Sequence, residues 1–202
     1  MALTYHNNNS ISNVTSFAQV PAGNPVLLST ATASASSSIS FTSGIDSTYD
    51  VYYFEFINCH PATDNAVFVF NGSTDSGSNY NVTKTTANFR AYHNEAGSTQ
   101  NLDYVSATDL AQSTDFTNLQ RDIGNGADES TSGSLLIFNP SSTTYVKHFM
   151  SDLNGYHQAN QSLRWFNAGY FNTTSAINAV QFKMESGNID AGTIKMYGIK
   201  AW

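Results

Sequence analysis

The run YDVYYFEFIN, residues 49–58, alternates its side chains with a period of two, which restricts this part of the chain to a β-strand. In an extended strand Tyr52, Phe54 and Phe56 fall on one face, while Glu55 falls on the other. The first face is the more apolar, so it is predicted to lie in a hydrophobic core. The face with Glu55 is predicted to meet an interface or a hydrogen-bonding neighbour, without catalysis.

Similar apolar runs recur along the chain, separated by the Gly, Asn and Ser residues that favour turns. They occupy residues 66–70, 80–92, 133–140, 143–151, 162–172, 176–184 and 192–202. The pairs Asn71-Gly72 and Asn154-Gly155 are predicted to be hairpin turns. Roughly eight to ten strands joined in this way predict an all-β fold, an antiparallel β-sandwich of jelly-roll type that is closed by the final strand.

Two stretches depart from this strand pattern and set the predicted domain organisation. Residues 1–35 are polar and are predicted to form an extended N-terminal arm, although residues 11–20 also fit one short helix and the Ser/Thr-rich end fits a linker or the start of a strand. Residues 36–202 are predicted to form the sandwich, with a long excursion at 94–132. Within that excursion, residues 109–123 fit a helix or two short turns.

Charge and cysteine content exclude several classes of function. The chain carries a net charge of −7 with only eight Lys and Arg residues, too few to neutralise a nucleic acid or an anionic membrane. Cys59 is the only cysteine, so no intrachain disulfide is expected. The opening residues lack the basic start and apolar core of a secretory signal. No run approaches the ~20 apolar residues of a membrane-spanning helix.

The sequence contains no motif that predicts a catalytic, metal-binding or cofactor-binding residue. The five histidines lack ligand spacing, and no GxSxG nucleophile motif occurs. Glu55 is a lone acid, whereas glycoside hydrolysis needs two converging carboxylates. Residues 71–77 and 124–130 offer oxygen ligands but do not match the calcium-loop spacing, so solvated turns are expected there. We therefore predict a protein that is not an enzyme and uses no cofactor.

Four aromatic residues are candidates for contact with a glycan or a protein partner, because aromatic rings stack on the faces of pyranose rings. They are Tyr156, Trp165, Tyr170 and Trp202. Packing in the core for Trp165, or in an interface for Trp202, is the alternative. The loops expected to carry such a site are residues 71–79, 94–132 and 152–161.

Three long stretches carry a resemblance to a known family: SLLIFNPSSTTYVKHFMSDLNGYH, AGYFNTTSAINAVQFKMESGNIDAGTIKMYGIK and YFEFINCHPATDNAVFVFNG. Together with the opening MALTYHNNNSISNVTS and the middle AYHNEAGSTQ and DLAQST, they resemble the β-sandwich virion structural proteins of marine tailed bacteriophages, of the cyanophage and pelagiphage type. The resemblance covers nearly the whole chain and brings no catalytic residue with it. It implies a virion component that is assembled in the host cytoplasm.

Two functions follow as expectations from this resemblance. The first is a capsid decoration (cement) protein, a homotrimer that sits on the head and bridges the major capsid protein or other virion proteins. The second is a tail fibre or tail-tip module that binds a host-surface glycan. Decoration is favoured because the chain lacks coiled-coil heptads and shaft-like repeats. An enzyme acting on polysaccharide is the least supported reading.

Overall fold

The fold is all-β and antiparallel, as predicted from the alternating runs. The structure, a computed structural model, describes residues 24–200. Twelve strands occur there: β1 (Val26–Ser36), β2 (Ile39–Phe41), β3 (Val51–Pro61), β4 (Ala66–Ser73), β5 (Lys84–Asn94), β6 (Gln100–Tyr104), β7 (Thr117–Ile123), β8 (Thr131–Phe138), β9 (Lys147–His157), β10 (Gln161–Phe171), β11 (Ala179–Met184) and β12 (Ile189–Ile199). One 3-10 turn, η1 (Ser106–Thr108), accompanies them, and the described residues contain no α-helix.

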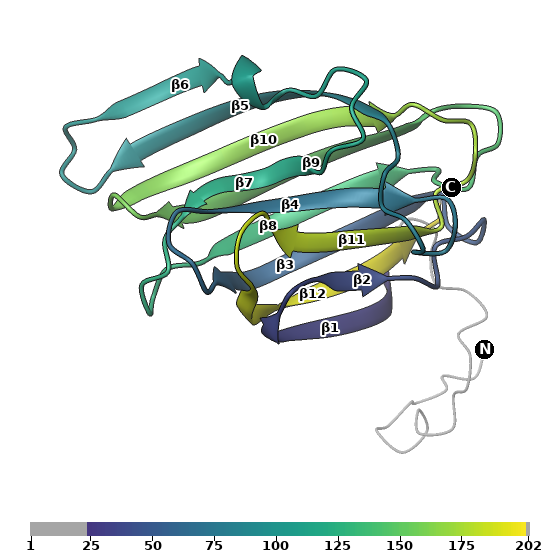
Figure 1. The fold of residues 1–202 in the computed structure, drawn as a ribbon, viewed down its shortest axis with the longest axis horizontal. Helices are drawn as coiled ribbons and strands as arrows, with labels where there is room; N and C mark the ends of the chain where they lie inside the picture. The colour runs from purple at the N-terminus through teal and green to yellow at the C-terminus, as the bar shows by residue number, and fades with distance from the viewer. Residues whose placement is uncertain (1–23, 201–202) are drawn as a thin grey trace, which may run out of the picture.

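The strands form two layers that are hydrogen-bonded into one nearly closed, sandwich-like sheet (Figure 1). The large layer has the order β1-β12-β3-β8-β9-β10-β5-β6, and the small layer has the order β7-β4-β11-β2. A single bridge between Ile123 of β7 and His157 of β9 joins the layers along one side. On the other side the chain passes from β1 in the large layer to β2 in the small one.

The core between the layers is built from phenylalanine rings. Phe182 of β11 lies at its centre, with its ring centroid 5.3 Å from that of Phe54 and 5.2 Å from that of Phe56. Phe70 of β4 reaches across to Phe149 of β9 at 5.1 Å. Most of these pairs meet edge to face, the arrangement that aromatic quadrupoles favour. The rings therefore fix how the two layers sit on one another.

The prediction of which face of β3 (Val51–Pro61) lies in the core is confirmed. Tyr52, Phe54 and Phe56 are all at most 1% exposed. The Tyr52 hydroxyl is satisfied at the strand's end, where it donates to the backbone oxygen of Asp46 at 3.0 Å. The last strand, β12, lies between β1 and β3 and buries Ile194 in the same core. It is thus an inner strand of the large layer, which explains its apolar character.

The predicted boundary between arm and sandwich needs correction. Residues 26–36 are strand β1, which pairs along its length with β12, so the sandwich begins before residue 36. The Ser/Thr-rich composition of β1 reflects its position at the edge of the sheet, where one face meets water. The short helix predicted at residues 11–20 lies outside the described residues.

The hairpin turns predicted at Asn71-Gly72 and Asn154-Gly155 are wrong, because both pairs lie inside strands. Gly72 lies within β4 and Gly155 within β9. A Cβ atom on Gly72 would come within 2.9 Å of the Phe171 ring, and one on Gly155 within 3.0 Å of the Gln120 side chain. Glycine leaves room at both positions for neighbouring side chains to pack against the strand backbone. The turn between β9 and β10 comes later, where Asn160 takes a left-handed conformation with φ 57°.

The excursion at 94–132 contains strands, and residues 117–123 are one of them in place of the helix or two short turns expected at 109–123. Residues 100–104 form β6 and residues 117–123 form β7, with η1 between them. Alternate residues of β7, such as Leu119, point into the core, and the strand pairs with β4. β7 thereby becomes part of the small layer, so the excursion is built into the sandwich.

Candidate functional site

The four aromatic candidates do not form one site. Trp165 is completely buried, and its indole Nε1 donates to Asn88 Oδ1 at 3.2 Å, so its ring cannot stack on a glycan. Tyr156 and Tyr170 lie at opposite ends of the β9–β10 hairpin, paired with Ser162 and His148 respectively. The Tyr156 hydroxyl donates to Glu95 Oε1 at 3.0 Å, which raises the pKa of this tyrosine. Trp202 lies outside the described residues.

A buried polar network holds the segment that follows β6 against the large layer. Asn88 on β5 accepts hydrogen bonds from Trp165 Nε1 and, at 2.7 Å, from Asn167 Nδ2. Its own Nδ2 donates to Thr108 O and to Asp109 Oδ1, both at 3.1 Å. Asn88 therefore links β5 and β10 of the large layer to residues 105–110 through side-chain hydrogen bonds. No sequence motif predicts this link.

The solvent side of the large layer is a continuous sheet surface, which we call the outer face. We define it by two cross-strand rows. One row is Tyr104, Phe89, Phe166, Asp152, Ser134, Glu55, Lys195 and Thr30. The other is Ala87, Ala168, Met150, Leu136, Tyr53, Tyr197 and Leu27.

Exposed apolar side chains concentrate on this outer face. The described residues expose six large hydrophobic side chains, and Leu27, Phe89, Tyr104 and Met150 belong to the two rows. A fifth, Leu102, is paired with Ala91 beside them. Phe89 and Phe166 stack with centroids 4.4 Å apart, so part of the apolar surface is already ordered. A contiguous apolar patch of this kind is typical of a contact surface.

Charges on the outer face neutralise one another. Lys195 Nζ lies 3.5 Å from Glu55 Oε2. Arg164 lies outside the two rows but on the same side of β10 as Phe166, and its Nη2 is 2.5 Å from Asp152 Oδ2. The face thus has two basic and two acidic groups, whereas the whole chain has eight basic and 15 acidic residues. Glu55 has the hydrogen-bonding neighbour expected for it, because the Tyr197 hydroxyl also donates to Glu55. A partner covering this face would leave no charge unpaired.

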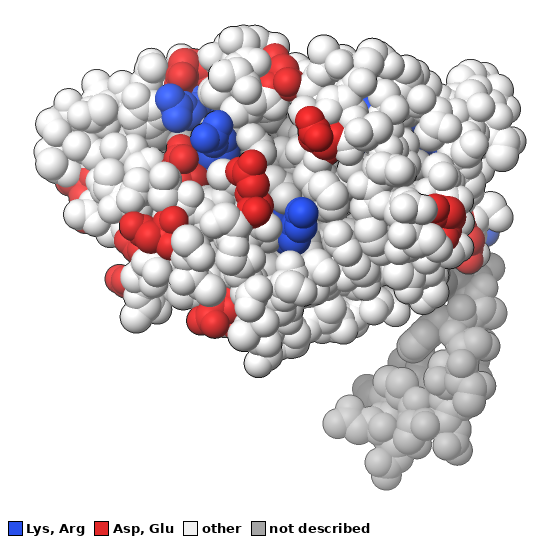
Figure 2. All heavy atoms as spheres, viewed as in Figure 1, with Lys and Arg blue, Asp and Glu red and all other residues white. Residues whose placement is uncertain are grey.

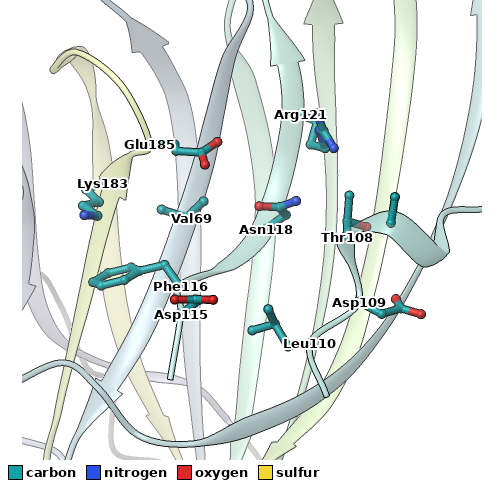
Figure 3. A pocket seen from close by; sticks show the side chains of 11 residues that line it. Val69, Thr108, Asp109, Leu110, Asp115, Phe116, Asn118, Arg121, Lys183 and Glu185 are labelled. Atoms are coloured by element: carbon teal, nitrogen blue, oxygen red, sulfur yellow. The ribbon is translucent and has the colours of Figure 1, made fainter. Parts of the chain in front are cut away.

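The opposite side of the molecule, over the small layer, is polar and hollowed. Figure 2 shows acidic and basic side chains spread over that side. A hollow of about 450 Å³ lies over β4, β7 and β11 and is bordered by residues 107–116. Figure 3 shows its side chains arranged around a shared space. The residues that matter below are Asp109, Phe116, Asn118, Arg121, Lys183 and Glu185.

None of the six hollow residues was singled out in the sequence, although part of the hollow comes from the 94–132 excursion that was expected to carry contacts. Of the remaining members, Lys183 belongs to β11 and Glu185 directly follows the last residue of that strand. Their meeting with Phe116 depends on strand order, which no local pattern encodes.

Two lysines are buried in the core at the end of the sandwich. Lys84 and Lys147 flank Phe171 in the register of the large layer, and both are 0% exposed. Lys84 Nζ donates to Asn71 Oδ1 at 2.7 Å and to Val82 O at 2.9 Å. Burial lowers the pKa of Lys84 to about 7, against a smaller opposing effect of Asp115, and burial also lowers the pKa of Lys147.

The free energy of unfolding is expected to rise with pH between about 7 and 10.5 because of Lys84. In that window the unfolded chain holds a proton on this lysine that the folded chain has lost. The contribution is at most about 1.4 kcal/mol per pH unit. Lys84→Met should remove this part of the slope in urea unfolding at pH 7, 8 and 9. Equal slopes for the two proteins would contradict the assignment.

Asp75 and Cys59 also have shifted pKa values, each with a local cause. Asp75 accepts hydrogen bonds from Ser73 and Asn79, which lower its pKa to about 2 and hold the 71–79 loop together. Burial raises the pKa of the Cys59 thiol to about 12, as suits a packed side chain. Within residues 24–200, no cluster of three or more His, Cys, Asp or Glu side chains is placed to hold a metal ion. The same residues include no helix long and apolar enough to cross a membrane.

Comparison of the chain with protein-family models, with curated proteins and with solved structures gave no match.

Proposed function

We propose that this protein is a structural component of a phage virion, a decoration protein that docks on the head through its outer face. The observation that carries the proposal is the concentration of exposed apolar side chains on one sheet surface whose charges are paired. The resemblance of the sequence to virion proteins of marine phages supports the proposal that the protein is part of a virion. Docking of this kind requires no reaction, only the burial of complementary surface.

The dimensions of the outer face are sufficient for stable docking. Eight strands about 4.8 Å apart and roughly 30 Å long give about 1,000 Å² of surface. Specific protein complexes bury about 800 Å² on each partner. The partner that suits it is an apolar surface without net charge, such as a surface of the major capsid protein. A trimer would place three copies around a local axis of the shell.

Immunogold labelling of purified virions with an antibody to this protein tests the location. Gold distributed over the heads supports decoration, and gold confined to the tail would contradict it in favour of a tail module. Absence of gold from intact and from disrupted particles would refute the virion assignment itself.

Placing a charge in the centre of the outer face should abolish docking. Met150 is 56% exposed, so Met150→Glu leaves the fold intact but introduces an unpaired charge that docking would have to desolvate. We expect the affinity for protein-depleted heads to fall at least about tenfold. Co-sedimentation with the heads measures this. Tyr145→Glu is the matched control, because Tyr145 is an exposed apolar side chain on the loop before β9. Equal loss in both variants would contradict docking by the outer face.

A further inference from the structure

We propose that the hollow over the small layer binds a neutral saccharide, with one pyranose ring seated between Phe116 and Arg121. The site is separate from the outer face, because it belongs to the other layer of the sandwich. Its volume of about 450 Å³ lies within the range of small-ligand sites. The inference is independent of virion docking and describes what the uncovered side of the protein does.

Three polar side chains of the hollow, those of Asn118, Arg121 and Glu185, lack a hydrogen-bond partner among the described residues. Among the described residues, the side chains of Asn118 and Glu185 make no hydrogen bond, and the nearest carboxylate to Arg121 Nε is Asp122 at 3.9 Å. Elsewhere the arginines are paired closely, as for Arg90 with Asp103 at 3.1 Å. Donors and acceptors that converge on a hollow without pairing are available to a ligand (Figure 3).

The hollow is lined by both basic and acidic side chains, and this combination indicates the chemical class of the ligand. Arg121 and Lys183 disfavour a metal cation, whereas Asp109 and Glu185 disfavour a phosphate or sulfate. A sugar hydroxyl donates one hydrogen bond and accepts others, so it can serve Glu185 and Arg121 equally well. A neutral polyol is therefore the ligand that satisfies both kinds of group.

Phe116 supplies the apolar part of the site. Its ring is partly exposed in the hollow, and Lys183 Nζ lies 4.4 Å from the ring centroid, which orders both side chains. The C–H face of a pyranose packs on an aromatic ring, while its hydroxyls point outward to polar groups. Because Lys183 Nζ covers one face of the Phe116 ring, a pyranose would pack on the part of the ring that stays exposed and extend its hydroxyls toward Asn118 and Arg121.

The segment that carries Phe116 is held in place before any ligand arrives. Its backbone is bonded to β5 through Thr86 N to Leu110 O at 2.9 Å and Lys84 N to Ser113 O at 2.8 Å. Asp109 is fixed by Asn88, whose backbone N donates to Asp109 Oδ1 at 2.8 Å. A site ordered in this way loses little conformational entropy on binding.

Amide NMR spectra of the full-length ¹⁵N-labelled protein test the inference. The probes are the methyl pyranosides of glucose, galactose, mannose and N-acetylglucosamine, each titrated separately, with inorganic phosphate as a fifth. We expect at least one sugar to shift amides around Phe116, Asn118 and Arg121, with a dissociation constant in the range of about 1 to 10 mM. Phosphate should leave them unshifted.

Substitutions in the hollow test whether the sugar binds there, and a substitution on the outer face serves as the control. Phe116→Ala and, independently, Glu185→Ala should each weaken sugar binding at least about tenfold. Glu185 is exposed and without a hydrogen-bond partner among the described residues, so its variant should fold normally. Phe166→Ala, on the outer face, is the matched aromatic control and should bind as the parent protein does. No shift with any sugar, shifts by phosphate alone, or undiminished binding in both hollow variants would overturn the inference.

Discussion

Phe182→Ala is expected to lower the free energy of unfolding by about 4 kcal/mol, the cost of removing a fully buried ring from a core that cannot collapse around the space. Phe182 is 0% exposed. Its ring meets five others within 6.2 Å, from both layers of the sandwich: Phe41, Phe54, Phe56, Phe68 and Phe70. Since these rings define how the layers pack, their contacts are lost together.

Equilibrium unfolding in urea measures the effect, with Phe166→Ala as the matched control. Phe166 is stacked on Phe89 but lies on the outer face, so its removal should cost about 1 kcal/mol. Similar losses for the two variants would mean that Phe182 does not occupy the centre of the core. The comparison therefore tests the two-layer arrangement itself.

Asn88→Ala is expected to lower the free energy of unfolding by about 3 kcal/mol and to release the segment at residues 105–110. The substitution leaves the buried Trp165 Nε1 without its acceptor and removes the donor to Thr108 O. An orphaned buried polar group costs about 1 to 3 kcal/mol, and here more than one bond is lost. Asn167 keeps its bonds to Thr117 and Asn118, which limits the damage.

Hydrogen exchange separates this effect from a general loss of stability. In Asn88→Ala the amides of Val105 and Thr108 should exchange faster than those of β3, because they lose their local anchor. Asn154→Ala is the matched control, since Asn154 is exposed and its side chain accepts a bond only from Ser162. Uniformly faster exchange throughout the sandwich of Asn88→Ala would contradict a local anchoring role.

Asn88 also connects the buried network to the hollow. It holds Asp109, which borders the hollow, while its partner Asn167 lies on β10 of the large layer. The shape of the hollow thus depends on a residue that does not line it. A change at Asn88 is expected to disturb the hollow and leave the outer face, on the other side of β5 and β10, in place.

Local alternation in the sequence determined the fold class and the core face of β3. Tyr52, Phe54 and Phe56 had to share one side of an extended strand, and a chain with many such runs had to bury them between sheets. The charge balance likewise fixed a polar, weakly charged surface. These properties follow from single segments and need no knowledge of neighbours.

Tertiary structure alone decided which residues meet. The sequence predicted turns at Gly72 and Gly155 because Asn-Gly pairs favour turns. It does not show that the side chains of Phe171 and Gln120 pack against these glycines in the folded protein. The helix expected at 109–123 is partly a strand because β4 offers it a pairing edge. The outer face and the hollow both depend on cross-strand register. A period of two places a side chain on one side of its own strand, but strand order determines its neighbours.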